Sequence, residues 1–268
     1  MQQIRSVSAW ATCFEVCDGM RLRNRKVEWS VLLLAMLGAM QCRAQESGVT
    51  ANVAITRSES SNAKAASGKE QLLDASNVAI WLTPVDRAGG DPVKNVASEK
   101  TPQLVQRHKT FEPHVLIVPV GTRVEFPNKD PFFHNIFSLF DGKRFDLGLY
   151  EAGTTRTVLF DRAGVSFLFC NIHAEMSAVV LSVDTPYFGL TDRSGNLHIR
   201  DVPNGRYQVN VWFERTAPEY LKKLSKVVTI TEASRSLGTI RIQENPNFTL
   251  AHKNKYGLDY VPPPQTEY

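Results

Sequence analysis

The sequence has little net charge, few cysteines and, after its first 44 residues, no long apolar run. Its 31 basic and 27 acidic residues give a formal net charge of only +4 over 268 residues. A nucleic-acid-binding protein concentrates lysine and arginine on one face, so this balance argues against nucleic acid as a partner. Hydrophobic residues make up 43% of the chain, which is too many for an intrinsically disordered protein. Without a later apolar run of about 20 residues, we expect no transmembrane segment in the mature chain.

The first 44 residues have the order of an export signal. A basic cluster at residues 21–26 precedes an apolar run at 31–40, and Cys42-Arg43-Ala44 then offers small residues where a signal peptidase reads them. The apolar run is about half as long as a membrane-spanning helix. We therefore expect a signal peptide over residues 1–44, cleavage after Ala44, and export to the periplasm of a Gram-negative bacterium.

Two alternatives to this signal peptide remain open. An amphipathic core helix is disfavoured because charge, apolar run and small residues occur in the order of a signal. A lipoprotein acylated at Cys42 is disfavoured because Met40-Gln41 stands where small residues precede such a cysteine. The true start of the chain, at Met1 or Met20, also stays open.

Removal of residues 1–44 changes both the charge and the cysteine content. Six basic and three acidic residues leave, so the mature chain has 25 basic against 24 acidic residues. Cys13, Cys17 and Cys42 leave as well, and Cys170 is then the only cysteine. An unpaired thiol is a liability in an oxidising compartment, and Cys170 has no partner for an internal disulfide. A bound metal ion is the leading explanation for how this thiol is protected.

Short strands separated by turn signals dominate the rest of the chain. Two of them, near Leu197 and near Val209, alternate apolar and polar residues after the turn signals at 192–195 and 202–205. The other runs of β-branched and aromatic residues are 49–56, 77–83, 114–119, 123–126, 155–160, 165–170, 178–183, 227–231 and 237–242. The only helical candidate is Pro218–Leu224. This spacing, without long helical periodicity, predicts an all-β fold of the sandwich type.

Three metal-binding side chains recur at three-residue steps between two apolar strands: Cys170, His173 and Met176. A thiolate, an imidazole and a thioether together suit a soft metal, copper above all. A type 1 copper site needs a second imidazole, and His134 is the candidate. Zinc is the weaker alternative, because structural zinc sites prefer more thiolates and rarely use methionine. A metal-free site, in which each side chain has an ordinary role, is the other alternative.

Two segments of the chain resemble plastocyanin-like cupredoxins. Residues 118–130, followed by His134-Asn135, are similar to the first ligand region of that family. Residues 169–176 are similar to the ligand loop, with the Cys-x-x-His-x-x-Met spacing of amicyanin. The resemblance spans residues 102–184 and implies a Greek-key cupredoxin β-sandwich, which we place at 99–185.

The resemblance also implies a role for each site residue. His134, Cys170 and His173 would be the equatorial ligands of one type 1 copper ion, and Met176 the axial ligand. Asn135 would tie the two ligand segments together by hydrogen bonds from beside the first histidine.

By the same resemblance, the function would be to carry single electrons between redox partners. Electrons would pass through the exposed edge of His173. Phe132, Phe133 and Ile172 would form an apolar patch around it, on which a transient redox partner, a cytochrome or a dehydrogenase, could dock.

An enzymatic copper site is not expected. A binuclear centre needs two cysteines in the ligand loop, and position 171 is Asn. Multicopper oxidases and copper nitrite reductases need further histidine ligands, commonly in His-x-His pairs. The remaining histidines form no such pair, and we expect the side chain of His114 to be solvated; they are His108, His114, His198 and His252.

A second module follows, because residues 192–207 resemble the carboxypeptidase-regulatory, transthyretin-like β-sandwich. We expect it to be discontinuous, over 71–98 and 186–244, with the cupredoxin inserted in it; alternatively, residues 77–82 are an extra edge strand of the cupredoxin. Residues 45–70 would be a flexible N-terminal segment and 245–268 an extended tail. The alternative function is a cell-envelope binding protein or a copper-binding protein, in which this module carries the function.

Residues 137–150 form an expected insertion between the two halves of the cupredoxin. They are similar to exported proteins labelled methylamine-utilisation-like. No amine oxidation follows from that label.

Overall fold

The computed structural model describes residues 48–57, 73–86, 100–139, 142–245, 247–249 and 252–260. The expected signal peptide, its cleavage site after Ala44 and the alternative lipid site at Cys42 lie outside these ranges. In the described part the chain forms strands and one short helix, α2 (Pro218–Leu224), so the expected all-β fold is confirmed. Within the same ranges, no helix has the length and apolar character that crossing a membrane requires.

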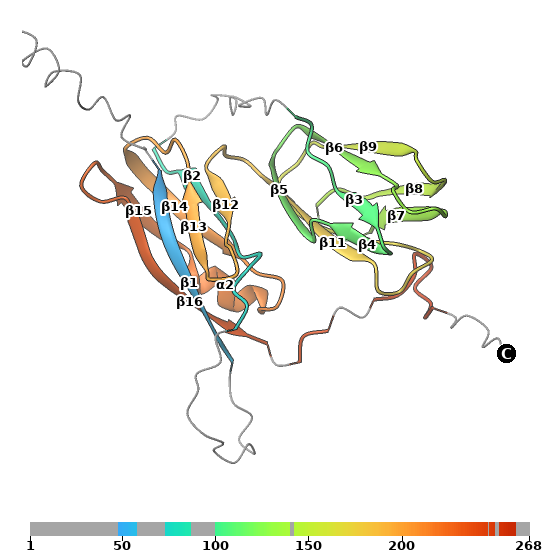
Figure 1. Ribbon diagram of the computed structural model, residues 1–268. Coiled ribbons are helices and arrows are strands. Elements are labelled where there is room, and N and C mark those ends of the chain that lie inside the picture. Colours follow the sequence, from blue (N-terminus) through green and yellow to red (C-terminus); the bar gives the residue numbers. More distant parts are fainter. Residues whose placement is uncertain are drawn as a thin grey trace, which may run out of the picture. The chain divides into compact units, whose positions relative to one another are not determined.

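Seven of the described strands form one β-sandwich (Figure 1). One sheet has the order β13-β1-β16 and the other the order β12-β2-β14-β15. The bounds of these strands are β1 (Val49–Arg57), β2 (Ala79–Pro84), β12 (Phe188–Leu190), β13 (Asn196–Ile199), β14 (Gly205–Trp212), β15 (Lys226–Ile230) and β16 (Ser236–Glu244). The two sheets share a buried apolar core that includes Val53, Ile80, Val209 and Ile242. Alternation in β14 explains this packing, because Tyr207, Val209 and Val211 are buried and the residues between them are not.

The first two strands of this sandwich pair with strands that follow far later in the chain. β1 runs antiparallel to β13 and parallel to β16, and β2 is an inner strand between β12 and β14. Within the expected flexible segment over residues 45–70, Val49–Arg57 forms the strand β1, as the apolar run at 49–56 predicts. Val49, Ala51 and Val53 are apolar at alternate positions and fill the core. The transthyretin-like identity of this sandwich and its boundaries stay predictions.

The turn at Asp192 to Gly195 shows why this sandwich needs a glycine there. The Gly195 amide donates to the Asp192 carbonyl at 3.0 Å, and Gly195 has a φ of 78°. A Cβ atom at this position would lie 2.0 Å from the Val53 carbonyl oxygen of β1. Glycine allows both the positive φ and the close approach of β1.

A second set of strands, β3 to β11, contains the residues of the predicted copper site (Figure 1). One sheet has the order β5-β11-β10-β7-β8, and the pairs β6-β9 and β3-β4 pack against it through a core that includes Phe126, Ile136, Phe160, Leu168 and Val180. The bounds are β3 (Val105–Arg107), β4 (Thr110–Glu112), β5 (Val115–Pro119), β6 (Thr122–Pro127), β7 (His134–Ser138), β8 (Phe145–Tyr150), β9 (Thr155–Phe160), β10 (Gly164–Phe169) and β11 (Ser177–Val183).

The sequence pattern predicts neither β7 nor β8. The expected insertion at residues 137–150 is instead the end of β7 and the whole of β8, which pairs with β7 at the edge of the sheet. All five residues of β7 are buried, so the strand has no polar alternation to indicate it. Gly148, with a φ of 65°, interrupts the strand pattern of β8.

Residues 254–258, within the expected extended tail at 245–268, form a hydrogen-bonded turn. The Asn254 amide donates to the Leu258 carbonyl, and the Gly257 amide donates to the Asn254 carbonyl, both at 2.9 Å. The Asn254 side-chain oxygen accepts from the amides of Tyr256 and Leu258. Asparagine stabilises turns by such contacts, and this tail therefore has a local structure of its own.

Candidate metal centre

Two segments of the second set of strands supply the predicted ligands. His134 is the first residue of β7, and Cys170 directly follows β10. The loop from Cys170 to Met176 leads into β11 and closes on itself by backbone hydrogen bonds. The Cys170 amide donates to the Met176 carbonyl, and the Met176 amide donates to the His173 carbonyl, both at 3.1 Å.

The structure brings Cys170, His134 and His173 together. The Sγ atom of Cys170 lies 3.8 Å from Nδ1 of His134 and 3.6 Å from Nδ1 of His173. The three ligand atoms lie within 4.8 Å of one another. Metal–ligand bonds of about 2.0–2.3 Å place the atoms around one ion roughly 3–4 Å apart, so these separations fit a single bound ion. Within the described ranges, no other group of three or more His, Cys, Asp or Glu side chains brings its ligand atoms close enough together to hold a metal ion.

Met176, the predicted axial ligand, is fully buried in the same core cluster as Cys170. Its backbone closes the ligand loop, as described above. A buried thioether beside a buried thiol agrees with either core packing or weak axial ligation. Its role as a ligand stays a prediction.

The surroundings of Cys170 favour its thiolate form. Burial raises the pKa of the thiol, but the hydrogen bond with His134 and those from the backbone amides of Asn135, Ile172 and His173 outweigh burial, so the pKa is lowered. The thiolate is the form that binds metals.

The two imidazoles differ in their electrostatic surroundings. Burial, together with the positive charges of His134 and Lys109, lowers the pKa of His173. Burial also lowers the pKa of His134, but its hydrogen bonds with Cys170 and Asp130 outweigh burial, and the pKa is raised. His173 is thus held in the neutral form that a metal requires, while His134 is paired with the thiolate.

Asp130 is part of the site, although sequence reasoning missed it. Its Oδ2 atom lies 2.8 Å from Nε2 of His134, which leaves Nδ1 facing Cys170. The backbone amides of His108 and Lys109 donate to the same carboxylate at 2.6 and 2.9 Å. A carboxylate on the far nitrogen of a ligand histidine fixes its tautomer and orientation. The available signal was an aspartate four residues before the histidine, which also has the ordinary appearance of a turn residue.

Asn135 makes one contact to the ligand loop and one away from it. Its backbone amide hydrogen-bonds to Cys170, which links β7 to the ligand loop. Its side-chain amide donates to Asp146 of β8 at 2.7 Å. The side chain thus connects the site to the edge of the sheet.

The three residues of the predicted docking patch differ in exposure. Phe133 is 55% exposed and Ile172 45% exposed, whereas Phe132 is half-buried. The Phe132 ring lies 5.2 Å from the His134 ring and 5.7 Å from the His173 ring, between centroids. Of these three residues, Phe132 thus packs against the partly exposed ring of His173.

No protein-family model and no curated protein matches the chain. Among solved structures, it is similar to a novel purple cupredoxin from Nitrosopumilus maritimus at 26% identity, over 31% of this chain and 99% of that one, with a TM-score of 0.29. It is similar to a mutant of amicyanin with Cu(I) at 16% identity, over 33% and 87% of the two chains, with a TM-score of 0.30. A copper-containing nitrite reductase from Thermus scotoductus SA-01 shows 26% identity over 38% of this chain and 25% of its own, with a TM-score of 0.30.

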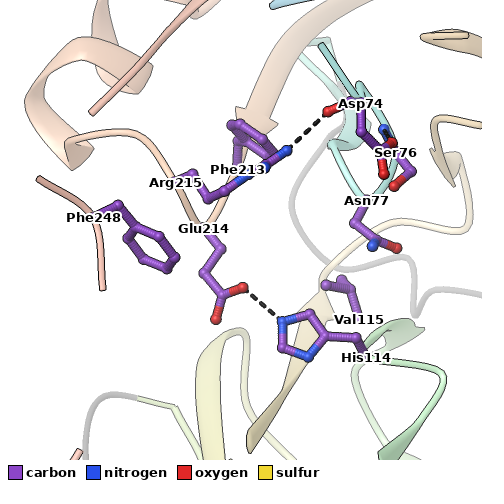
Figure 2. A pocket seen from close by; sticks show the side chains of 9 residues that line it. All are labelled: Asp74, Ser76, Asn77, His114, Val115, Phe213, Glu214, Arg215 and Phe248. Carbon is purple, nitrogen blue, oxygen red and sulfur yellow. Dashed lines mark hydrogen bonds and ion pairs between the residues drawn. The ribbon is translucent and has the colours of Figure 1, made fainter. Parts of the chain in front are cut away.

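A separate pocket lies around His114 and Glu214 (Figure 2). Nε2 of His114 and a Glu214 carboxylate oxygen are 2.6 Å apart, and the second ring nitrogen of His114 contacts the Ser177 carbonyl at 3.1 Å. Arg215, on the other side of the pocket, donates to the Asp74 carbonyl at 2.8 Å. The expectation of a solvated His114 is therefore wrong, because the ring is paired with a nearly buried carboxylate.

Asp130→Asn is expected to weaken copper binding about 10- to 100-fold, because the neutral amide holds His134 less firmly. The measurement is competition for Cu(II) against a chelator of known affinity. Asp161→Asn, which removes an ion pair with Lys143 away from the site, is the control and should not change the affinity. Equal affinities of Asp130→Asn and wild type would show that the carboxylate does not support the ligand.

The His114–Glu214 pair should make stability depend on pH. The hydrogen bond with Glu214 is the main cause that raises the pKa of His114 above its ordinary value of 6.5. The stabilisation that this pair gives the folded protein is then complete below pH 6.5. It is lost as the pH rises through the raised pKa that His114 has in the folded state. Urea unfolding of the metal-free protein should show that Glu214→Gln lacks the additional free energy of unfolding at low pH. The variant Glu219→Gln should retain it. Parallel pH curves for wild type and Glu214→Gln would refute the coupling.

Proposed function

We propose that the protein is an exported type 1 (blue) copper protein that carries single electrons. The observation that carries the proposal is the position of the Cys170 Sγ atom, 3.8 and 3.6 Å from the Nδ1 atoms of His134 and His173. One thiolate and two imidazoles, with the buried thioether of Met176 in the same core cluster as Cys170, suit copper better than zinc. Cys170 is the only free cysteine of the described residues and is fully buried, which agrees with protection by a metal in an oxidising compartment.

Copper held there would supply a centre that gains and loses one electron with little ligand movement. His134 is fully buried and Asp130 holds its far nitrogen, so this ligand has no route to solvent. His173 is partly exposed, its ring contacts Phe132, and its neighbour in the sequence, Ile172, is exposed. The edge of the His173 ring is therefore the point at which electrons would enter and leave.

A carrier agrees better with this ligand set than an enzyme does. Catalytic metal sites keep one coordination position open for substrate or water. Four protein ligands, His134, Cys170, His173 and Met176, would leave no such position. The patch of Phe132, Phe133 and Ile172 is small and apolar, which suits a transient redox partner of the cytochrome or dehydrogenase type.

Addition of Cu(II) to the purified protein should give an intense visible absorption band, because the thiolate donates charge to the ion. Cys170→Ser should abolish the band, whereas His198→Asn, on β13, should keep it. Absorption titration measures both the intensity and the stoichiometry, which we expect to be one ion per chain. The assignment fails if no band forms or if the band survives Cys170→Ser.

Ile172→Lys is expected to slow electron exchange about tenfold, because a charge in the apolar patch disfavours docking by on the order of 1.4 kcal/mol. The measurement is stopped-flow reduction of the copper-loaded protein by reduced cytochrome c. Val227→Lys is the matched control, since Val227 is 49% and Ile172 45% exposed. Equal rates for both variants would contradict the patch. A blue protein that exchanges electrons with no redox protein would favour the alternative, a binding role for the other sandwich.

A further inference from the structure

The C-terminal segment of the chain contacts three successive residues: Phe169 at the end of β10, and Cys170 and Asn171 of the ligand loop. The Tyr260 hydroxyl donates to the Cys170 carbonyl at 2.6 Å. The Lys255 backbone amide donates to the side-chain oxygen of Asn171 at 3.0 Å. The His252 ring stacks on the Phe169 ring, with centroids 4.2 Å apart and an angle of 24° between the planes. We call His252, Lys255 and Tyr260 the C-terminal clamp.

The clamp is also connected, through Asp146 of β8, to β7, the strand that carries the first predicted ligand. The Lys255 ammonium lies 2.7 Å from Oδ2 of Asp146. The other oxygen of Asp146 accepts from the Asn135 side chain at 2.7 Å, and the backbone amide of Asn135 hydrogen-bonds to the sulfur of Cys170. One chain segment is thus connected to Cys170 from the ligand loop and from β7.

Contacts within the C-terminal segment hold the residues of the clamp in place beside the loop. The rings of His252 and Tyr260 meet edge to face, with centroids 5.4 Å apart. The turn that begins at Asn254 lies between them and fixes the chain at Lys255. The loop needs such support, since Ile172 is 45% exposed and the loop packs few apolar side chains of its own apart from Met176.

We propose that the clamp is a positioning device for the copper thiolate, with Tyr260 and Lys255 as its positioning residues; this inference rests on the proposed function. A hydrogen bond to the Cys170 carbonyl fixes the peptide plane that carries the cysteine side chain. The position of Sγ relative to the two imidazoles is then set before any ion binds. Ligands held in this way by their neighbours bind a metal with less rearrangement and tune its electronic properties.

Tyr260→Phe removes the hydroxyl alone, and Tyr220→Phe makes the same change at a tyrosine of α2, which is not part of the clamp. In the metal-free protein, Tyr260→Phe should speed hydrogen exchange of the amides in residues 170–176 about two- to tenfold, the effect of one lost hydrogen bond. In the copper-loaded protein it should shift the absorption band and the midpoint potential. Tyr220→Phe should leave exchange, band and potential unchanged.

A second pair of variants covers the case in which Tyr260→Phe does not fold. Lys255→Met keeps the backbone amide that binds Asn171 but removes the contact with Asp146, and Lys253→Met is its control. Lys255→Met should change exchange, band and potential in the same direction as Tyr260→Phe.

Each outcome decides the inference. If Tyr260→Phe and Lys255→Met both show the hydrogen exchange, absorption band and midpoint potential of the wild type, the inference is wrong. Faster exchange with an unchanged band and potential shows that the segment only stabilises the loop, which overturns its role in positioning the thiolate. A wild-type protein that forms no band with copper contradicts the proposed function, while faster exchange in Tyr260→Phe still supports a clamp on the loop.

Discussion

The site depends on a thiol that is completely buried yet surrounded by groups that stabilise its charge. A buried ionised group is costly unless it is paired and hydrogen-bonded. Cys170 receives a hydrogen bond from His134 and three from backbone amides, and these outweigh the burial that would otherwise raise its pKa. His134 in turn is held by Asp130. The result is a buried thiol whose ionised form is stabilised inside an apolar core, and a soft cation would stabilise that form further.

The sheet arrangement creates this condition by joining two segments that are distant in sequence. β7 supplies His134 and the amide of Asn135, and the end of β10 supplies Cys170. β7 and β10 are neighbours in the five-stranded sheet, with Phe137 opposite Phe169, so the ligands meet where one strand begins and the other ends. The core around Phe126, Ile136 and Leu168 keeps these strand ends in register. The ligand distances are thus a consequence of strand pairing.

The sequence predicts the parts of this arrangement that are local and misses those that depend on distant contacts. The spacing of Cys170, His173 and Met176 indicates metal chemistry by itself, and the alternation in β14 predicts its buried face. Asp130 looks like a turn residue until His134 is placed beside it, and β7 lacks alternation because all its residues are buried. The C-terminal contacts join residues about 90 positions apart, and no local pattern indicates such a pairing.

The ligand loop combines residues that are exposed to solvent with residues that the C-terminal segment holds in place. An electron carrier needs one ligand near the surface, but an exposed loop tends to be mobile. On one side, His173, Ile172 and Phe133 remain partly or largely exposed. On the other side, Cys170 and its neighbours are held by Tyr260, Lys255 and His252. The supporting contacts use the backbone of Cys170 and the side chains of its two neighbours, and none of these contacts involves the His173 ring.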